Sequence, residues 1–71
     1  MQIASVTADI AARVRDERRR QGMDQATLAL VANVAVRSVH RIEKGEQTVR
    51  LDTLLRVLSA LGLRIEIRSR A

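Results

Sequence analysis

The sequence predicts an all-α domain of four short helices, followed by one C-terminal β-strand that pairs across a homodimer. Apolar residues recur at helical spacing in four separate segments. The segments are divided by residues that end helices, at Gly22, Asn33, the stretch Gly45 to Thr48, and Gly62. After Gly62 the apolar period shortens to two residues, which is typical of a strand.

The size of the chain bounds its architecture. With 71 residues there is room for one domain, covering residues 1–71. A domain this small buries a thin core and usually needs further stabilisation. The chain has no cysteine and a single histidine, which excludes disulfides and argues against a zinc site. Oligomerisation is therefore the stabilising device that we expect.

The composition favours a polyanionic partner. The net charge is +5 and the sequence pI is about 11.5. The chain has no aromatic residue, whereas single-strand binders and most RNA-binding modules stack bases on aromatic rings. Duplex DNA is thus the better target. We find no apolar run of membrane-spanning length and no signal peptide, so we expect a cytoplasmic protein without a membrane partner.

The first two helices are marked by their ends. The first is predicted to begin near Thr7 as N-cap and to end at Gly22, with residues 1–6 a weak strand candidate. The second follows Asp24 as N-cap. Its predicted inner face is Leu28, Val31 and Ala32, and Asn33 is expected to end it in the left-handed conformation.

The third helix is predicted from Val36 to Lys44, with Val39 and Ile42 directed inward. Two short helices divided by a tight break at residues 33–35 are the pattern of a helix-turn-helix, whose second helix enters the major groove of DNA.

The fourth helix, from Leu51 to Leu61, is apolar over more than one face, which suggests a second buried contact. The strand is predicted at residues 63–68, where apolar and charged residues alternate. A lone strand cannot satisfy its backbone groups, and the simplest partner is the same strand of a second copy. The predicted dimer contact comprises Leu54, Leu58, Leu61, Leu63, Ile65 and Ile67.

Residues 10 to 68 resemble the Xre, or lambda-repressor-like, helix-turn-helix family. The matching residues are Arg18, Gly22, Gln25, Leu28, Ala29, Val34, Val39, Ile42, Glu43 and Gly45. The segment from Leu51 to Leu63, with the strand after it, is similar to the HipB-like antitoxin branch, in which such a strand pairs across the dimer. Ala35 and Arg50 depart from the family by standing where Ser or Thr usually caps a helix.

The resemblance implies a role for three of these residues. Gln25 is expected to hold a DNA phosphate, rather than being merely an exposed polar side chain. Arg18 and Glu43 are expected to form an internal ion pair that orients the third helix. The resemblance also implies autoregulatory repression of an operon and a possible HipA-like kinase toxin as partner.

The third helix and the loop after it supply the other candidate DNA contacts. Arg37 is expected to read a guanine, while Arg41 is open between a base and a phosphate. Val36 suits a thymine methyl group or a packing role, and Ser38 suits a phosphate or a base. His40 suits the DNA backbone or a base, although a lone surface histidine more often has no binding role. Backbone contacts are assigned to Lys44, Thr48 and Arg50.

Catalysis is not expected. No serine or threonine has a histidine or lysine at motif spacing, and no carboxylate pair suits a cleft. We therefore expect no cofactor, no metal and no small-molecule substrate. The competing hypothesis is a protein-interaction module that neutralises a partner through the fourth helix and the strand, and a third is a repressor that has no toxin.

Overall fold

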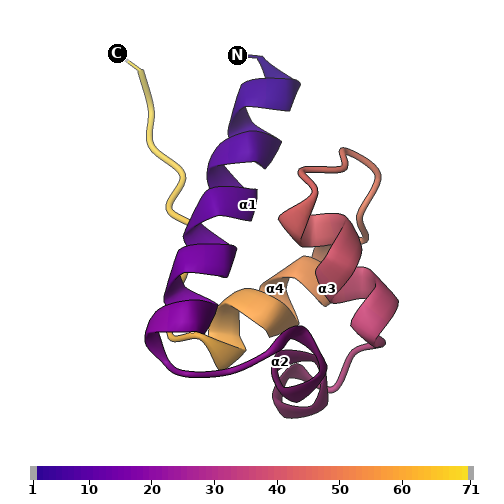
Figure 1. The fold of residues 1–71 in the computed structure, drawn as a ribbon. Coiled ribbons are helices and arrows are strands. Elements are labelled where there is room, and N and C mark those ends of the chain that lie inside the picture. Colours follow the sequence, from indigo (N-terminus) through magenta and orange to yellow (C-terminus); the bar gives the residue numbers. More distant parts are fainter. Residues whose placement is uncertain (1, 71) are drawn as a thin grey trace.

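The structure is a computed structural model and describes residues 2–70. Its four helices are α1 (Ile3–Arg20), α2 (Gln25–Ala32), α3 (Val36–Glu43) and α4 (Leu51–Ala60). In Figure 1, α1 runs the length of the molecule, and the three shorter helices gather beside its C-terminal half. The predicted all-α class and the number of helices are confirmed. No helix within the described residues is long and apolar enough to cross a membrane.

One side chain from each helix is completely buried. These are Val14 of α1, Leu28 of α2, Val39 of α3 and Val57 of α4, and they belong to a single apolar cluster. Because every helix contributes to the same cluster, no helix can leave without exposing the apolar side chains of the others. The position of α3 is thus fixed by the whole domain.

Helix α1 begins earlier than the sequence indicated. It starts at Ile3, so the weak strand prediction is wrong for residues 3–6, and Met1 lies outside the described residues. Thr7 is inside the helix, where its hydroxyl donates to the carbonyl oxygens of Ile3 and Ala4. A threonine can form such a bond within a helix as readily as it caps one, and the sequence does not distinguish the two roles.

Both ends of α2 have the capping residues that the sequence predicted. The Asp24 carboxylate accepts a 2.7 Å hydrogen bond from the backbone N–H of Thr27, which caps α2. Asn33 ends α2 with φ 58° and ψ 48°, in the left-handed region. The predicted inner face of α2 needs one correction, because Ala29 is buried while Val31 is 58% exposed. Burying Leu28, Ala29 and Ala32 together turns the position of Val31 outward.

The wide apolar surface of α4 is divided between the core and solvent. Leu58 and Leu61 are buried in the core of the protomer, and Leu54 packs against it. Leu51 and Leu55 remain exposed. The surplus apolar area that the sequence indicated is therefore carried by Leu51 and Leu55, on the outside of the domain.

The tail, residues 64–70, has no regular secondary structure, and there is no strand anywhere within residues 2–70. The predicted strand is thus not formed in the single chain, where no second segment offers a hydrogen-bonding edge. The last backbone hydrogen bond before the tail runs from Leu63 N–H to the carbonyl of Leu58, at 2.8 Å. Both ends of the chain lie at the same end of the molecule (Figure 1).

The tail nevertheless keeps the alternation of a strand. Glu66 accepts hydrogen bonds from both Arg64, at 3.3 Å, and Arg68, at 2.9 Å. Side chains two residues apart can meet in this way when the backbone is extended. The three charged side chains therefore share one side of the tail, which leaves the opposite side to the apolar Ile65 and Ile67.

Candidate nucleic-acid interface

Helix α3 presents one face to the core and the other to solvent. Val39, Ile42 and Glu43 are buried. Of the residues predicted to contact DNA, Val36, Arg37, His40 and Lys44 are exposed, and Ser38 is half-buried in the first turn. Positions 36, 37, 40 and 44 lie on one side of a helix that turns once every 3.6 residues. The structure therefore brings these four side chains onto one solvent-facing surface.

Arg37 and Arg41 differ in their surroundings. Within residues 2–70, the side chain of Arg37 makes no hydrogen bond or ion pair. Arg41 donates to Glu46 Oε1 at 3.0 Å and, through Nη2, to the carbonyl and hydroxyl oxygens of Thr48 at 2.8 and 3.1 Å. Arg41 therefore ties α3 to the loop that follows it, while Arg37 retains all its donors.

The remaining loop candidates are also exposed. Thr48 accepts the two bonds from Arg41, and Arg50 precedes α4 without capping it. Arg50 instead pairs with Asp52 at 3.1 Å. Both of these side chains are largely exposed, so the pair contributes little to stability and Arg50 can exchange Asp52 for another anion.

A buried ion pair joins α1 to the end of α3. Arg18 Nε lies 2.7 Å from Glu43 Oε2, and Arg18 Nη2 lies 2.9 Å from Glu43 Oε1. The side chains of Arg18 and Glu43 are only 10% and 5% exposed. Arg18 also donates through Nη1 to the carbonyl of Met23 at 2.9 Å. This two-pronged geometry is the strongest form of an arginine–carboxylate contact.

Both members of the pair are ionised. Burial by itself raises the pKa of the Glu43 carboxyl, but the hydrogen bonds from Arg18 and Gln25 outweigh it and hold the pKa below its usual range. The hydrogen bond to Glu43 raises the pKa of Arg18 still further. At neutral pH the carboxylate and the guanidinium therefore face each other as full charges.

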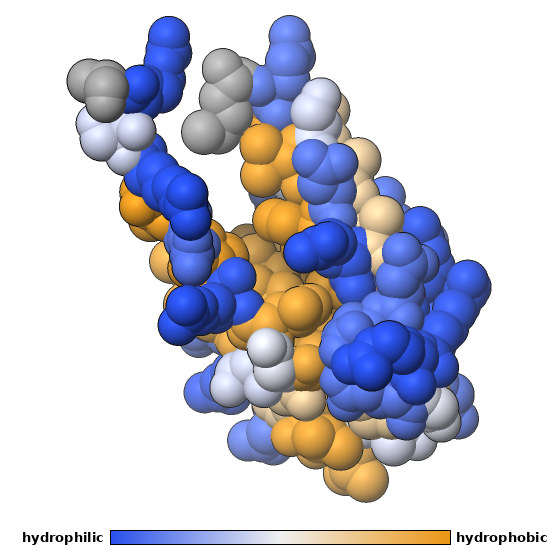
Figure 2. Space-filling view, turned by 90° about the vertical axis from the view of Figure 1, so that its left-hand side faces the viewer, coloured by the Kyte–Doolittle hydropathy of each residue, from blue (hydrophilic) through white to orange (hydrophobic). Residues whose placement is uncertain are grey.

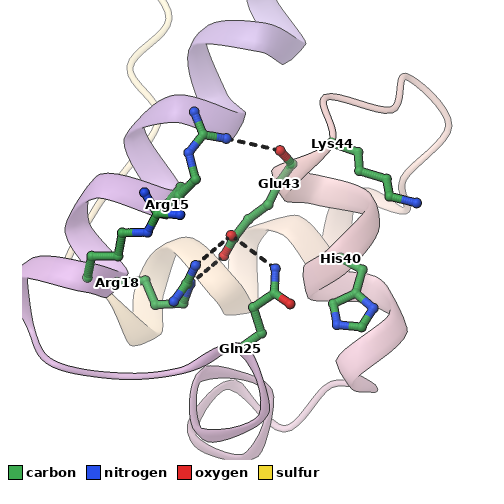
Figure 3. A pocket seen from close by; sticks show the side chains of 7 residues that line it. Arg15, Arg18, Gln25, His40, Glu43 and Lys44 are labelled. Atoms are coloured by element: carbon green, nitrogen blue, oxygen red, sulfur yellow. Dashed lines mark hydrogen bonds and ion pairs between the residues drawn. The ribbon is translucent and has the colours of Figure 1, made fainter.

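Gln25 belongs to the same network. Its Nε2 atom donates to Glu43 Oε1 at 3.2 Å, as Figure 3 shows. Gln25 is the first residue of α2, so one carboxylate connects α1, α2 and α3. An amide nitrogen carries two hydrogens, and the second is left for another acceptor on the solvent side.

Two residues that hold the helices together, Arg15 within this network and Gln21 outside it, were not predicted from the sequence. Arg15 Nη1 donates to the carbonyl oxygen of Glu43 at 3.3 Å and so caps the last turn of α3. Gln21 donates to the carbonyl of Leu61 at 3.0 Å and connects the ends of α1 and α4. Arg15 had a sequence signal, because it precedes Arg18 by one turn and shares its face. Gln21 had none.

An open hollow of about 400 Å³ lies beside this network, between α1, the start of α2 and the end of α3. We name it the basic hollow. Its lining residues are Arg15, Arg18, Arg19, Gln25, His40, Glu43 and Lys44. Four of them carry permanent positive charges and one carries a negative charge. A group that suits this surface is an anion.

A metal centre has no ligand set here. Within the described residues there is no group of three or more histidine, cysteine, aspartate or glutamate side chains that could hold a metal ion. The single buried carboxylate, that of Glu43, is occupied by Arg18 and Gln25.

Comparison with known proteins agrees with this geometry. Residues 14–67 match the family model described as helix-turn-helix. The chain is 42% identical, over 60 residues, to the uncharacterized HTH-type transcriptional regulator y4mF of Sinorhizobium fredii, an alignment that covers 84% of this chain and 79% of the relative. The matched segment contains the left-handed break at Asn33, the exposed face of α3 and the network around Glu43. The chain therefore belongs to the Xre, or lambda-repressor-like, helix-turn-helix family.

Proposed function

We propose that this protein is a sequence-specific, double-stranded DNA-binding transcriptional repressor, a single domain that acts in the cytoplasm as a homodimer. The main support for the proposal is the solvent-facing surface of α3, where the side chain of Arg37 makes no hydrogen bond or ion pair within residues 2–70. The ion pair of Arg18 and Glu43 holds the opposite, buried face of α3 against α1. A rigid helix that exposes an arginine near its N-terminal end suits the major groove. The printed name of the y4mF relative supports the regulatory role.

The roles of the individual residues follow from their surroundings. Arg37 reads a base, and Val36 meets the edge of the same groove. Gln25 donates its second amide hydrogen to a backbone phosphate, while the first remains hydrogen-bonded to the Glu43 carboxylate. Arg41 holds the loop in place, so that Thr48, Arg50 and Lys44 approach the backbone. Ser38 and His40 flank the groove and add contacts of lesser weight.

Selection from a randomised duplex library tests this proposal. The protein should enrich a pseudo-palindromic site whose halves lie about one helical turn, roughly 34 Å, apart. Its affinity for that site should fall steeply with salt, because each protomer contacts several phosphates. Enrichment of no sequence over the starting library would contradict specific binding.

The tail, residues 64–70, is the main support for the proposed homodimer. The backbone groups of residues 64–70 make no backbone hydrogen bond within the described chain, and Ile67 is 94% exposed. Figure 2 shows apolar surface continuing between the tail and α1. Two tails related by a two-fold axis would pair antiparallel, satisfy each other's backbone and cover Ile65 and Ile67. The two α3 helices would then stand at a fixed spacing.

The Ile67→Lys variant tests the pairing without disturbing the protomer. Ile67 has almost no contact within its own chain, so a lysine there leaves the fold intact, whereas lysine on a strand edge opposes pairing. Sedimentation should give a dimer for the parent and a monomer for the variant at micromolar concentration. Dimers of equal stability would show that the tail does not form the interface.

A second function, as the antitoxin of a HipA-like kinase toxin, rests on the resemblance of α4 and the tail to the HipB-like branch. The exposed Leu51 and Leu55 of α4 supply an apolar surface for such a partner. Co-expression with the product of the adjacent reading frame tests it. A stable complex that blocks the neighbour's toxicity supports the antitoxin role, and an adjacent product that neither binds nor is toxic contradicts it.

A further inference from the structure

The N-terminal part of α1, from Ile3 to Ile10, has little support within its own chain. The buried residues of α1 are Ala11, Val14 and Arg18, all of which come later in the helix. None of the residues from Ile3 to Ile10 is buried. Figure 1 shows this part of α1 extending beyond the three shorter helices, and its end has no side-chain cap. So short a helical segment is not stable in water by itself, and it therefore needs packing from another source.

One side of this segment is apolar. Ile3, Val6 and Ile10 recur at helical spacing and form a line along the helix, which we name the α1 stripe. Ile3 is 60% exposed and Val6 is 39% exposed, while Ile10 is half-buried where it packs against the core cluster. Figure 2 shows apolar surface between α1 and the tail. The α1 stripe is therefore an uncovered extension of the core.

The exposed area of the chain is larger than that of a compact monomer. A folded protein of 7.9 kDa is expected to expose about 4,400 Å². This chain exposes 5361 Å², an excess of roughly 950 Å². Each partner in a typical stable interface buries about 800 Å². The excess is thus of the size that a second protein molecule covers when it binds.

The paired tails need a supporting surface of their own. Antiparallel pairing satisfies the backbone of residues 64–70 and brings Ile65 and Ile67 of both copies onto one face of a two-stranded ribbon. Such a ribbon is marginal in water unless its apolar face packs against a further element. Leu58 and Leu61 of α4, which the sequence placed in the dimer contact, are already buried in the core of their own protomer. The α1 stripe, by contrast, is uncovered and faces the space beside the tail.

We propose that the α1 stripe is part of the dimer interface and packs against the apolar face of the ribbon formed by the two tails. The stripe is about 10 Å long and a seven-residue strand spans about 23 Å, so one ribbon is long enough to cover the stripes of both protomers. The occupant is a second copy of this chain, because the apolar face that meets the stripe is completed only when two tails pair. This inference rests on the proposed homodimer and gives α1 a role in it.

The test compares Val6→Lys with Ser5→Lys. Both variants add one positive charge to the same turn of α1 at an exposed position, but Ser5 lies two residues from Ile3 and therefore on the opposite side of the helix from it. Sedimentation equilibrium measures the dissociation constant of the dimer. Because Val6 is covered in both protomers, Val6→Lys should raise this constant by at least about 100-fold. Ser5→Lys should change it by less than about fivefold.

Hydrogen exchange gives a second readout and shows whether the variants fold. Amides in residues 3–10 should exchange slowly in the dimeric parent and in Ser5→Lys, and quickly in Val6→Lys and in Ile67→Lys, since a monomer leaves this segment uncovered. Residues 11–20, which the core holds, should stay protected in every protein. If Val6→Lys loses that protection, Ile3→Lys replaces it, because Ile3 is the more exposed member of the stripe.

The outcomes separate this inference from the tail pairing. A parent that is monomeric at micromolar concentration, or a dimer that Ile67→Lys leaves intact, contradicts the tail pairing and this inference with it. A dimer that Ile67→Lys dissociates, with equal dissociation constants for the stripe variant and Ser5→Lys, overturns the role of α1 alone. A dimer that both Ile67→Lys and the stripe variant weaken, while Ser5→Lys does not, supports the inference.

Discussion

Replacing Arg18 with methionine should greatly destabilise the domain at neutral pH. Methionine keeps most of the apolar stem of the arginine but removes both hydrogen bonds to Glu43 and the bond to the carbonyl of Met23. The Glu43 side chain is only 5% exposed, so water replaces the hydrogen bonds of the guanidinium poorly. The carboxylate must then remain charged and poorly paired inside the protein, or take up a proton.

Proton uptake by Glu43 gives one estimate of the cost in free energy. Protonating a carboxyl with an ordinary pKa of about 4.3 at pH 7 costs 1.36 kcal/mol for each of roughly 2.7 pH units, or about 4 kcal/mol. Direct removal of one partner from a buried ion pair costs about 3–5 kcal/mol. A chain of this length is expected to have a total stability of roughly 4–10 kcal/mol. The substitution should therefore lower the melting temperature by about 15–30 °C.

The effect should depend on pH in a defined direction. In the parent, the pKa of Glu43 is lowered on folding, so its stabilising contribution is present above about pH 4.3 and is lost as the pH falls through the folded-state value. In the variant, burial without Arg18 raises that pKa, so stability is lost as the pH rises. The difference between the two proteins should shrink from about 4 kcal/mol at pH 7 to about 1 kcal/mol at pH 5.

Urea denaturation followed by circular dichroism measures this difference, because the chain has no aromatic residue to report by fluorescence. Protein concentration is held fixed, since dimerisation would add to the apparent stability. The double variant Arg18→Met, Glu43→Leu is the control and should recover most of the loss. A loss below 1 kcal/mol that does not change between pH 7 and pH 5 would show that the ion pair contributes no more than a surface contact.

Three further predictions concern the ends and edges of the helices. Ala35→Ser should raise the free energy of unfolding by about 1 kcal/mol in urea titrations, because α3 has no side-chain N-cap. No gain would mean that the serine hydroxyl does not reach the backbone N–H groups at the start of α3. Gln25→Ala should weaken binding to specific and mixed-sequence duplexes by the same factor, measured by fluorescence anisotropy with labelled DNA, and a loss confined to one sequence would contradict a phosphate contact. Arg41→Ala should speed hydrogen exchange in residues 45–50 while leaving α3 protected, and unchanged exchange would show that Glu46 and Thr48 do not depend on Arg41.

Most of the fold could be predicted because its signals are local. Helical apolar spacing identified the buried Leu28, Val39 and Ile42, and the left-handed Asn33 was recognisable from its residue type between two short helices. The start of α1 could not be predicted, because Thr7 has the same sequence signature whether it caps a helix or bonds back within one.

Contacts that depend on tertiary structure could not be predicted from the sequence. The engagement of Arg41 requires the loop to fold back so that Thr48 lies beside α3, and no spacing rule encodes that path. The basic hollow needs α1 and the end of α3 to be adjacent before Arg19 and Lys44 can be seen to face a common space. The strand prediction for the tail concerns two chains, and a single chain cannot form it.

The base preference of the Arg37→Ala variant shows most directly whether α3 reads the DNA sequence. The parent and the variant are titrated with the selected duplex and with a set of duplexes that each change one base pair of the half-site. We expect Arg37→Ala to lose about 1–3 kcal/mol of binding free energy on the selected duplex and to become indifferent to one base pair, while its preferences at the other positions are kept. A variant that weakens equally on every duplex, or that keeps the full preference of the parent at each position, would contradict the claim that the exposed face of α3 reads the sequence.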